Sequence, residues 1–116
     1  MRFAPATSLR SGRPLPEDDA HPPVRLNRTM ACTRSEFLGW LGAAAHPAPL
    51  RVQGDLVTIV LHDGCVEIAL DEQPPRRLGA MSLPCLGVSF CFRGVVEQAR
   101  DGFIARFDLI SRRGGG

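Results

Sequence analysis

The stretch Leu56-Val-Thr-Ile-Val-Leu-His-Asp-Gly-Cys-Val-Glu-Ile-Ala-Leu70 decides the fold. Two apolar runs flank Asp63-Gly64, a dipeptide typical of the two-residue type I′ hairpin turn, in which both central residues need positive φ. This turn predicts an antiparallel hairpin in which His62 faces Cys65 and Leu61 faces Val66. Alternation then predicts one wholly apolar face, made of Val57, Ile59, Leu61, Val66, Ile68 and Leu70. The opposite, mixed face carries Leu56, Thr58, Val60, His62, Cys65, Glu67, Ala69 and Asp71.

Two more strands are predicted after the hairpin. Pro74-Pro75 closes its second strand, because proline cannot donate a hydrogen bond to a strand ladder. Residues 76–83 are predicted as a third strand, and Pro84-Cys85 as a short turn. Residues 86–92 then alternate strictly between apolar and small residues, which predicts a fourth strand. Upstream, residues 50–52 predict a short edge strand.

Helical patterns lie on both sides of these strands. Thr33 followed three residues later by Glu36 forms a capping box, and the apolar residues after it predict a helix that ends before His46-Pro47. After Gly94, apolar residues recur at three- and four-residue spacing, which predicts a C-terminal amphipathic helix. We therefore expect an α+β fold. A four-stranded antiparallel meander carries an N-terminal and a C-terminal helix on one face, as a two-layer sandwich.

The composition divides the 116 residues into three parts. Residues 1–29 hold five of the ten prolines and no sustained apolar period, which predicts a disordered arm, or upstream sequence if translation begins at Met30. Residues 30–113 are predicted to form one small domain, and residues 114–116 a flexible tail. All 14 basic residues are Arg, which is typical of a GC-rich, bacterial-like coding sequence.

Charge and motifs exclude several classes of function. Residues 30–116 carry nine Arg and nine carboxylates, so the domain lacks the basic surface that nucleic acids or anionic membranes require. No apolar run approaches the roughly 18 residues of a membrane span. Nucleophile elbows, phosphate-binding loops and dinucleotide fingerprints are absent. We expect a cytoplasmic protein with no catalytic residues and no cofactor.

The mixed face suggests protein binding. Leu56, Val60, Ala69 and Cys91 make this face small and partly apolar rather than charged. A domain of about 85 residues buries only about 60–65% of the surface of its unfolded chain, so self-association would stabilise it. The sequence thus predicts an interaction module, with a homodimer as the expected assembly and another protein as a further partner.

Two other sites are weighed against this interpretation. The predicted register places His62, Cys65 and Cys91 close together, and such a cluster could bind zinc or another soft metal, although the usual ligand spacing is missing. Arg76, Arg77 and Arg93 flank the strands and could clamp an anionic group. Ordinary solvated strand ends explain these arginines more simply.

Residues 30–48 suggest that the chain is exported. Arg34, the Phe37-Leu38 pair and the short apolar segment after it resemble a twin-arginine export signal, with Ser35 in place of the second arginine. Ala43-Ala44-Ala45 is similar to a cleavage site. The resemblance implies an exported protein, whereas the capping box implies an ordinary amphipathic helix that remains in the fold.

Overall fold

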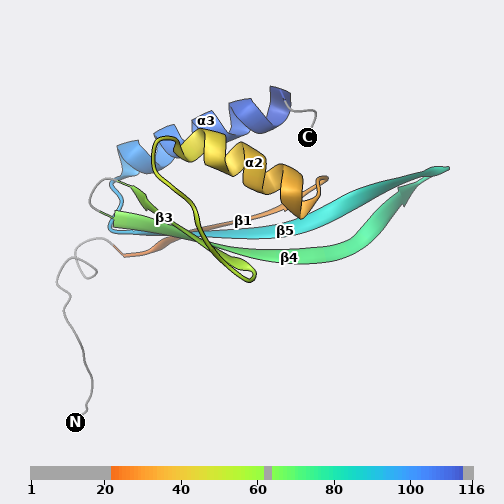
Figure 1. Cartoon of the computed structure of the whole chain (residues 1–116), viewed down its shortest axis with the longest axis horizontal. Coiled ribbons are helices and arrows are strands. Elements are labelled where there is room, and N and C mark those ends of the chain that lie inside the picture. Colours follow the sequence, from red (N-terminus) through yellow and green to blue (C-terminus); the bar gives the residue numbers. More distant parts are fainter. Residues whose placement is uncertain (1–21, 62–63, 114–116) are drawn as a thin grey trace, which may run out of the picture.

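The computed structural model describes residues 22–61 and 64–113, which form one antiparallel sheet and two helices (Figure 1). The elements in chain order are β1 (Val24–Met30), α2 (Arg34–Ala45), β2 (Arg51–Gln53), β3 (Leu56–Leu61), β4 (Gly64–Leu78), β5 (Met81–Arg93) and α3 (Glu97–Arg113). The five strands lie in the order β1-β5-β4-β3-β2. The α+β class and the antiparallel sheet are therefore confirmed. None of the helices in the described part of the chain is long and apolar enough to cross a membrane.

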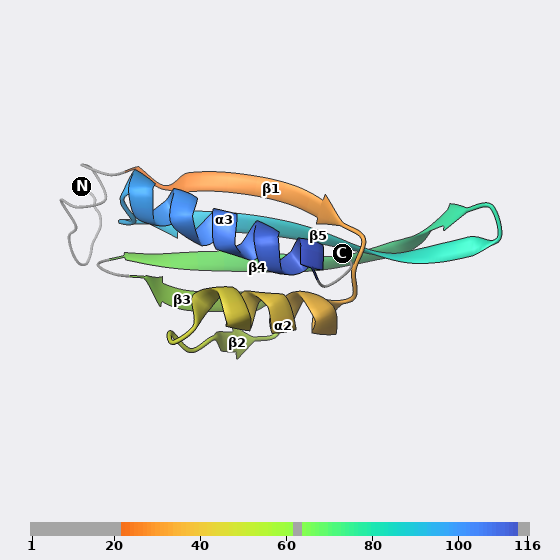
Figure 2. The ribbon, with the colours of Figure 1, turned by 90° about the horizontal axis from the view of Figure 1, so that it is seen from above.

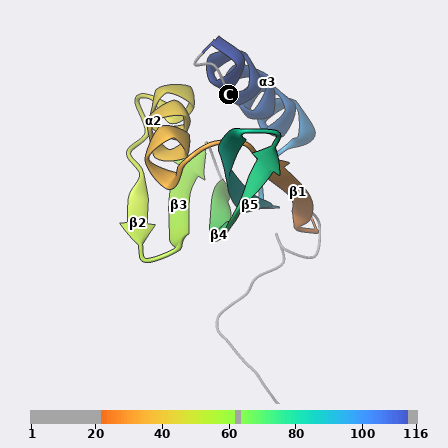
Figure 3. The same cartoon turned by 90° about the vertical axis from the view of Figure 1, so that its right-hand side faces the viewer.

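Both helices pack on the same face of the sheet (Figure 3). Helix α2 contributes Phe37 and α3 contributes Phe107, and their ring centroids lie 5.4 Å apart in an edge-to-face arrangement. Phe90 of β5 approaches both rings, at 6.4 Å and 5.9 Å. Edge-to-face aromatic pairs add to the stabilisation that burial alone provides. The core therefore lies between the helices and one face of the sheet.

Local sequence explains how α2 begins and ends. The Thr33 hydroxyl accepts a hydrogen bond from the backbone N–H of Glu36 at 3.1 Å, and the Glu36 carboxylate accepts one from the Thr33 N–H at 2.9 Å. This is the predicted capping box. The helix ends at Ala45, and the His46-Pro47 bond that follows it is cis.

The predicted faces of the β3–β4 hairpin are confirmed, but the predicted register is wrong. The six apolar residues of one face are all buried: Val57, Ile59, Leu61, Val66, Ile68 and Leu70. Leu61 pairs with Gly64 and Val60 with Cys65, a shift of two residues from the expected pairing. A shift of two preserves every face because side chains alternate with a period of two. Residues 62–63, and with them the predicted turn residue Asp63, lie outside the described residues.

A fifth strand replaces part of the predicted N-terminal arm. Val24–Met30 forms β1, which pairs with β5 from Val24 opposite Phe92 to Met30 opposite Leu86. Leu26 and Met30 are half-buried against the core, so this segment offers apolar surface despite its proline-rich surroundings. Disorder was therefore the wrong expectation for residues 24–29. Residues 1–21 and 114–116 lie outside the described residues.

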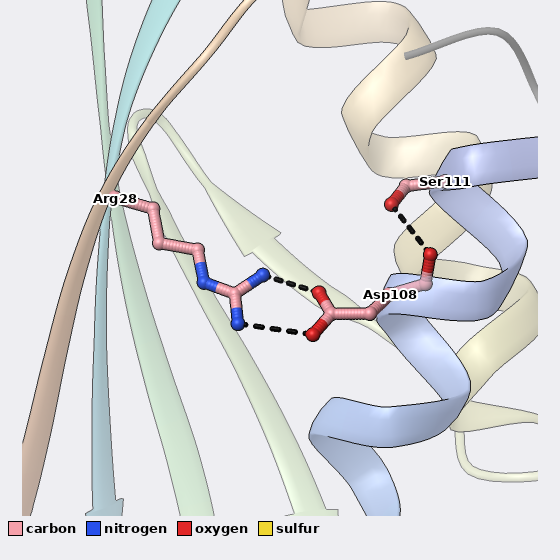
Figure 4. A network of polar contacts seen from close by, with 3 residues as sticks. All are labelled: Arg28, Asp108 and Ser111. Carbon is pink, nitrogen blue, oxygen red and sulfur yellow. Dashed lines mark hydrogen bonds and ion pairs between the residues drawn. The ribbon is translucent and has the colours of Figure 1, made fainter.

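An ion pair joins β1 to α3 (Figure 4). The two guanidinium nitrogens of Arg28 donate to the two carboxylate oxygens of Asp108, one of them at 3.1 Å. The pKa of Arg28 is raised because Asp108 accepts these hydrogen bonds. This bidentate contact fixes the edge strand to a helix 80 residues later in the chain.

The strands β4 and β5 form a long hairpin, and three of the strand boundaries predicted in this region are wrong. Strand β4 continues through Pro74-Pro75 to Leu78, and β5 starts at Met81 and runs through Pro84. A register shift between Gln73 and Arg76 leaves the two prolines out of the paired positions. No hydrogen bond between the strands is therefore lost because the prolines have no N–H group. The chain turns at residues 79–80, where Gly79 has a φ of 62°. The predicted strand at 76–83 is thus divided between β4 and β5, and the predicted strand at 86–92 is the second part of β5. The short edge strand predicted upstream is present as Arg51–Gln53.

Candidate functional site

The face of the sheet opposite the helices is the candidate site. No other element in residues 22–61 and 64–113 covers it, as the end-on view shows (Figure 3). We call it the uncovered face. The alternation and pairing of β1, β5, β4 and β3 assign to it Arg25, Asn27, Thr29, Gly87, Ser89, Cys91, Arg93, Cys65, Glu67, Ala69, Asp71, Leu56, Thr58 and Val60.

Small side chains hollow the middle of this face. The strand registers place Leu56, Ala69, Ser89 and Asn27 in one row across four strands. Two neighbouring hollows of about 170 and 250 Å³ share Asn27, Ala69 and Ser89 in their lining. We call the two hollows together the central groove. Its floor is low at Ala69 and Ser89, whereas the side chain of Gln73 lies over Gly87, with its amide nitrogen 2.8 Å from where a Cβ atom would be.

The structure exposes three of the four residues predicted for protein binding. Val60 is 67% exposed and Leu56 is 40% exposed, and Ala69, which lines both hollows of the central groove, is exposed as well. Cys91 belongs to the same face but is only 7% exposed. It therefore lines the bottom of the hollow, and a partner would touch it less than its neighbours.

Charged residues flank the groove. Arg93 donates to the carboxylate of Glu67 at 2.9 Å, and this hydrogen bond raises the pKa of Arg93. Arg25 lines one hollow and Asp71 the other. Over these four strands the uncovered face carries two arginines and two carboxylates, and the edge strand β2 adds Arg51, which pairs with Thr58 of this face.

The three arginines considered for anion binding do not form one site. Arg93 pairs with Cys65 at one end of the sheet, whereas Arg76 and Arg77 lie beyond Gln73 in the projecting part of β4. Arg76 pairs with Leu83 and Arg77 with Ser82. Because neighbouring strand residues point to opposite faces, these two guanidinium groups leave the hairpin on different sides.

The proposed metal ligands are only partly brought together. Cys65 and Cys91 lie on the uncovered face, on neighbouring strands, with Arg93 opposite Cys65 and Glu67 opposite Cys91. The observed register removes the predicted pairing of His62 with Cys65, and His62 itself lies outside the described residues. Within the described ranges, no group of three or more His, Cys, Asp or Glu side chains could hold a metal ion.

The segment that resembles an export signal is part of the core. Its apolar residues Phe37, Leu41 and Ala44 are each at most 1% exposed and pack in the main hydrophobic cluster. Helix α2 covers the sheet beside α3, and the two helices contact each other. The resemblance therefore rests on residues whose apolar character the fold itself requires.

Sequence reasoning missed the contribution of β1 to the uncovered face. Arg25, Asn27 and Thr29 alternate with Val24, Leu26 and Met30, which is the signature of a strand with one polar face. The signal was obscured because Arg28 occupies a helix-side position, where an apolar residue is expected. Its pairing with Asp108 could not be inferred from local sequence.

The comparisons with known proteins find no matching family model, no similar curated protein and no similar solved structure.

Proposed function

We propose that this protein is a non-catalytic binding module that associates with a second copy of itself through the uncovered face. The observation that carries the proposal is the exposure of Val60 and Leu56 beside the central groove. A solvated sheet face normally shows polar residues in alternation with the buried ones. Here the row through Leu56, Ala69 and Ser89 is small and partly apolar instead.

The size and charge of the domain favour a second copy as the partner. A small domain buries a limited share of its chain's surface, so covering one more sheet face adds a large fraction to its core. The uncovered face carries charges of both signs, among them the Arg93–Glu67 pair, so two copies can pack with opposite charges facing each other. Most soluble oligomers are symmetric assemblies of identical chains.

The test is the oligomeric state of the full chain, measured by sedimentation velocity over a range of protein concentrations. Val60→Glu places a charge on the most exposed apolar residue of the uncovered face. We expect the wild-type chain to be dimeric and Val60→Glu to be monomeric, with unchanged circular dichroism. Val52→Glu is the matched control, since Val52 is 44% exposed but pairs with the buried Val57 and so belongs to the helix side. A monomeric wild type, or a Val60→Glu variant that still dimerises, would disprove the proposal.

A further inference from the structure

The hairpin of β4 and β5 extends well beyond the rest of the sheet (Figure 2). On one side β1 reaches only Leu86, and on the other β3 reaches only Ala69. Within the described part of the chain, residues 73–85 therefore pair only with each other, and we call them the arm. The arm therefore lacks the third strand or packed helix that usually stabilises a two-stranded ribbon in water.

The end of the arm exposes large apolar side chains. Leu78 and Met81 face each other across the turn and are 55% and 62% exposed. Neither belongs to the hydrophobic cluster between the helices and the sheet. The arm carries two arginines, Arg76 and Arg77, and no carboxylate. Its composition is thus apolar and basic, which suits a surface with apolar hollows and some negative charge.

The arm presents its apolar residues on the side of the uncovered face. Along β5, Met81 and Leu83 alternate in step with Gly87 and Ser89, so all four share one side of the strand. On β4 the bulge at Pro74-Pro75 shifts the register by one residue and places Leu78 opposite Met81. The same shift turns Arg76 to this side, opposite Leu83. The side of the arm that carries Leu78 and Met81 is thus continuous with the uncovered face.

We propose that the arm of each molecule packs on the uncovered face of a second copy, with Leu78 and Met81 in the central groove. This inference rests on the self-association proposed above and names the segment that fills the interface. Two-fold symmetry makes the exchange reciprocal, because each chain carries one arm and one groove, and the assembly closes as a dimer.

Several features make the second copy the fitting occupant. The arm extends away from the sheet of its own chain (Figure 1), and its tip at Leu78 and Met81 lies several paired positions along the strands from Ala69 and Ser89 of its own central groove. Ala69 and Ser89 lower the middle of the groove between larger lining residues such as Arg25 and Gln73, and so leave room there for apolar side chains such as Met81 and Leu78. The carboxylate of Asp71, which lines one hollow, offers a counter-charge to Arg76 on the apolar side of the incoming arm.

The first test replaces exposed apolar residues by aspartate, either in the arm or on α3. In the double variant Leu78→Asp/Met81→Asp, two carboxylates would have to enter the central groove. We expect its dimer dissociation constant to rise by at least two orders of magnitude in sedimentation velocity. Leu109→Asp is the control, because Leu109 is 50% exposed on α3 and lies outside the proposed interface. Its dissociation constant should match that of the wild type.

The second test locates the arm directly. A photo-activatable benzoylphenylalanine is placed at position 78, and ¹⁵N-labelled and unlabelled chains are mixed before irradiation. We expect mixed-isotope cross-links between position 78 and peptides that contain Ala69 or Ser89. Cross-links confined to one isotope, or cross-links to α3, would overturn the inference.

The outcomes separate the two proposals. If the wild type is dimeric, Val60→Glu is monomeric and Leu78→Asp/Met81→Asp remains dimeric, the arm inference fails and the self-association through the uncovered face stands. If the wild type is monomeric at every concentration, both fail. Loss of dimer in both variants, with mixed-isotope cross-links to the groove, supports both.

Discussion

Gly64 lies so close to the backbone of Arg93 that a Cβ atom at position 64 would overlap the carbonyl oxygen of Arg93 and the backbone of Gly94. This contact occurs at the start of β4, beside the end of β5, where the chain leaves β5 for α3. The glycine is therefore required by a close approach of two backbones, in addition to any demand of the neighbouring turn.

Gly64→Ala should lower the free energy of unfolding by about 1–3 kcal/mol, the usual cost of overpacking, because the obstructing atoms belong to the backbone and cannot rotate away. Urea unfolding followed by circular dichroism would measure it. Gly39→Ala is the control: nothing lies within 4 Å of its Cβ position on α2, and alanine should raise the free energy by up to about 1 kcal/mol. Equal effects in the two variants would refute this explanation.

Gly64 also shows why the faces of the hairpin were predictable and its register was not. The alternating positions Val57, Ile59 and Leu61 are all apolar and share one face of the strand, and this assignment remains valid under a shift of two residues. The pairing depends on which residues form the turn. Asp63-Gly64 matches a common turn signal, but the glycine here serves a contact with Arg93, 29 positions later in the sequence.

The candidate site was predictable to a similar degree. The mixed character of the uncovered face follows from alternation, and Leu56, Val60 and Ala69 are exposed as expected. The arm could not be foreseen, because Pro74-Pro75 normally ends a strand. Only the register shift, a property of the paired strands, lets β4 continue past the prolines.

The Arg28–Asp108 pair should couple β1 to α3 energetically. Both side chains are 29% exposed, so solvent screens the pair less than a fully exposed one. In a double-mutant cycle with Arg28→Met and Asp108→Asn, we expect a coupling energy of about 1 kcal/mol, the upper end for accessible ion pairs. Urea unfolding of the four proteins gives this value. The coupling energy should decrease in 1 M NaCl. A coupling energy near zero at low salt would show that the contact does not stabilise the fold.

The capping box predicts an asymmetry between two neighbouring hydroxyl residues. Thr33→Ala removes the acceptor for the Glu36 N–H and should lower the free energy of unfolding by about 1 kcal/mol. Ser35→Ala, at an exposed position in the first turn of α2, should leave it unchanged or slightly higher. Thermal and urea unfolding would compare the two. A larger loss in Ser35→Ala would argue against the box as the origin of helix stability.

Cys32 gives the fold a dependence on alkaline pH. The side chain is 1% exposed, and burial raises the pKa of its thiol from 9.0 to about 11, with smaller contributions from Glu36 and Cys85. In the unfolded chain the thiol loses its proton near pH 9, whereas the folded protein holds it to higher pH. The unfolded state therefore gains stability as the pH rises through this interval, and the folded state is fully favoured only below it.

The free energy of unfolding should thus fall between about pH 9 and about pH 11, by at most about 1.4 kcal/mol per pH unit for this single group. Urea unfolding in the presence of a phosphine reductant, followed by the fluorescence of Trp40, would measure the slope. Cys32→Ala retains the other three cysteines and should remove this part of the slope, although the lost side-chain volume lowers stability at every pH. If the variant keeps the wild-type slope, the alkaline dependence arises from another group, because the unfolding equilibrium responds only to groups whose proton affinity differs between the two states.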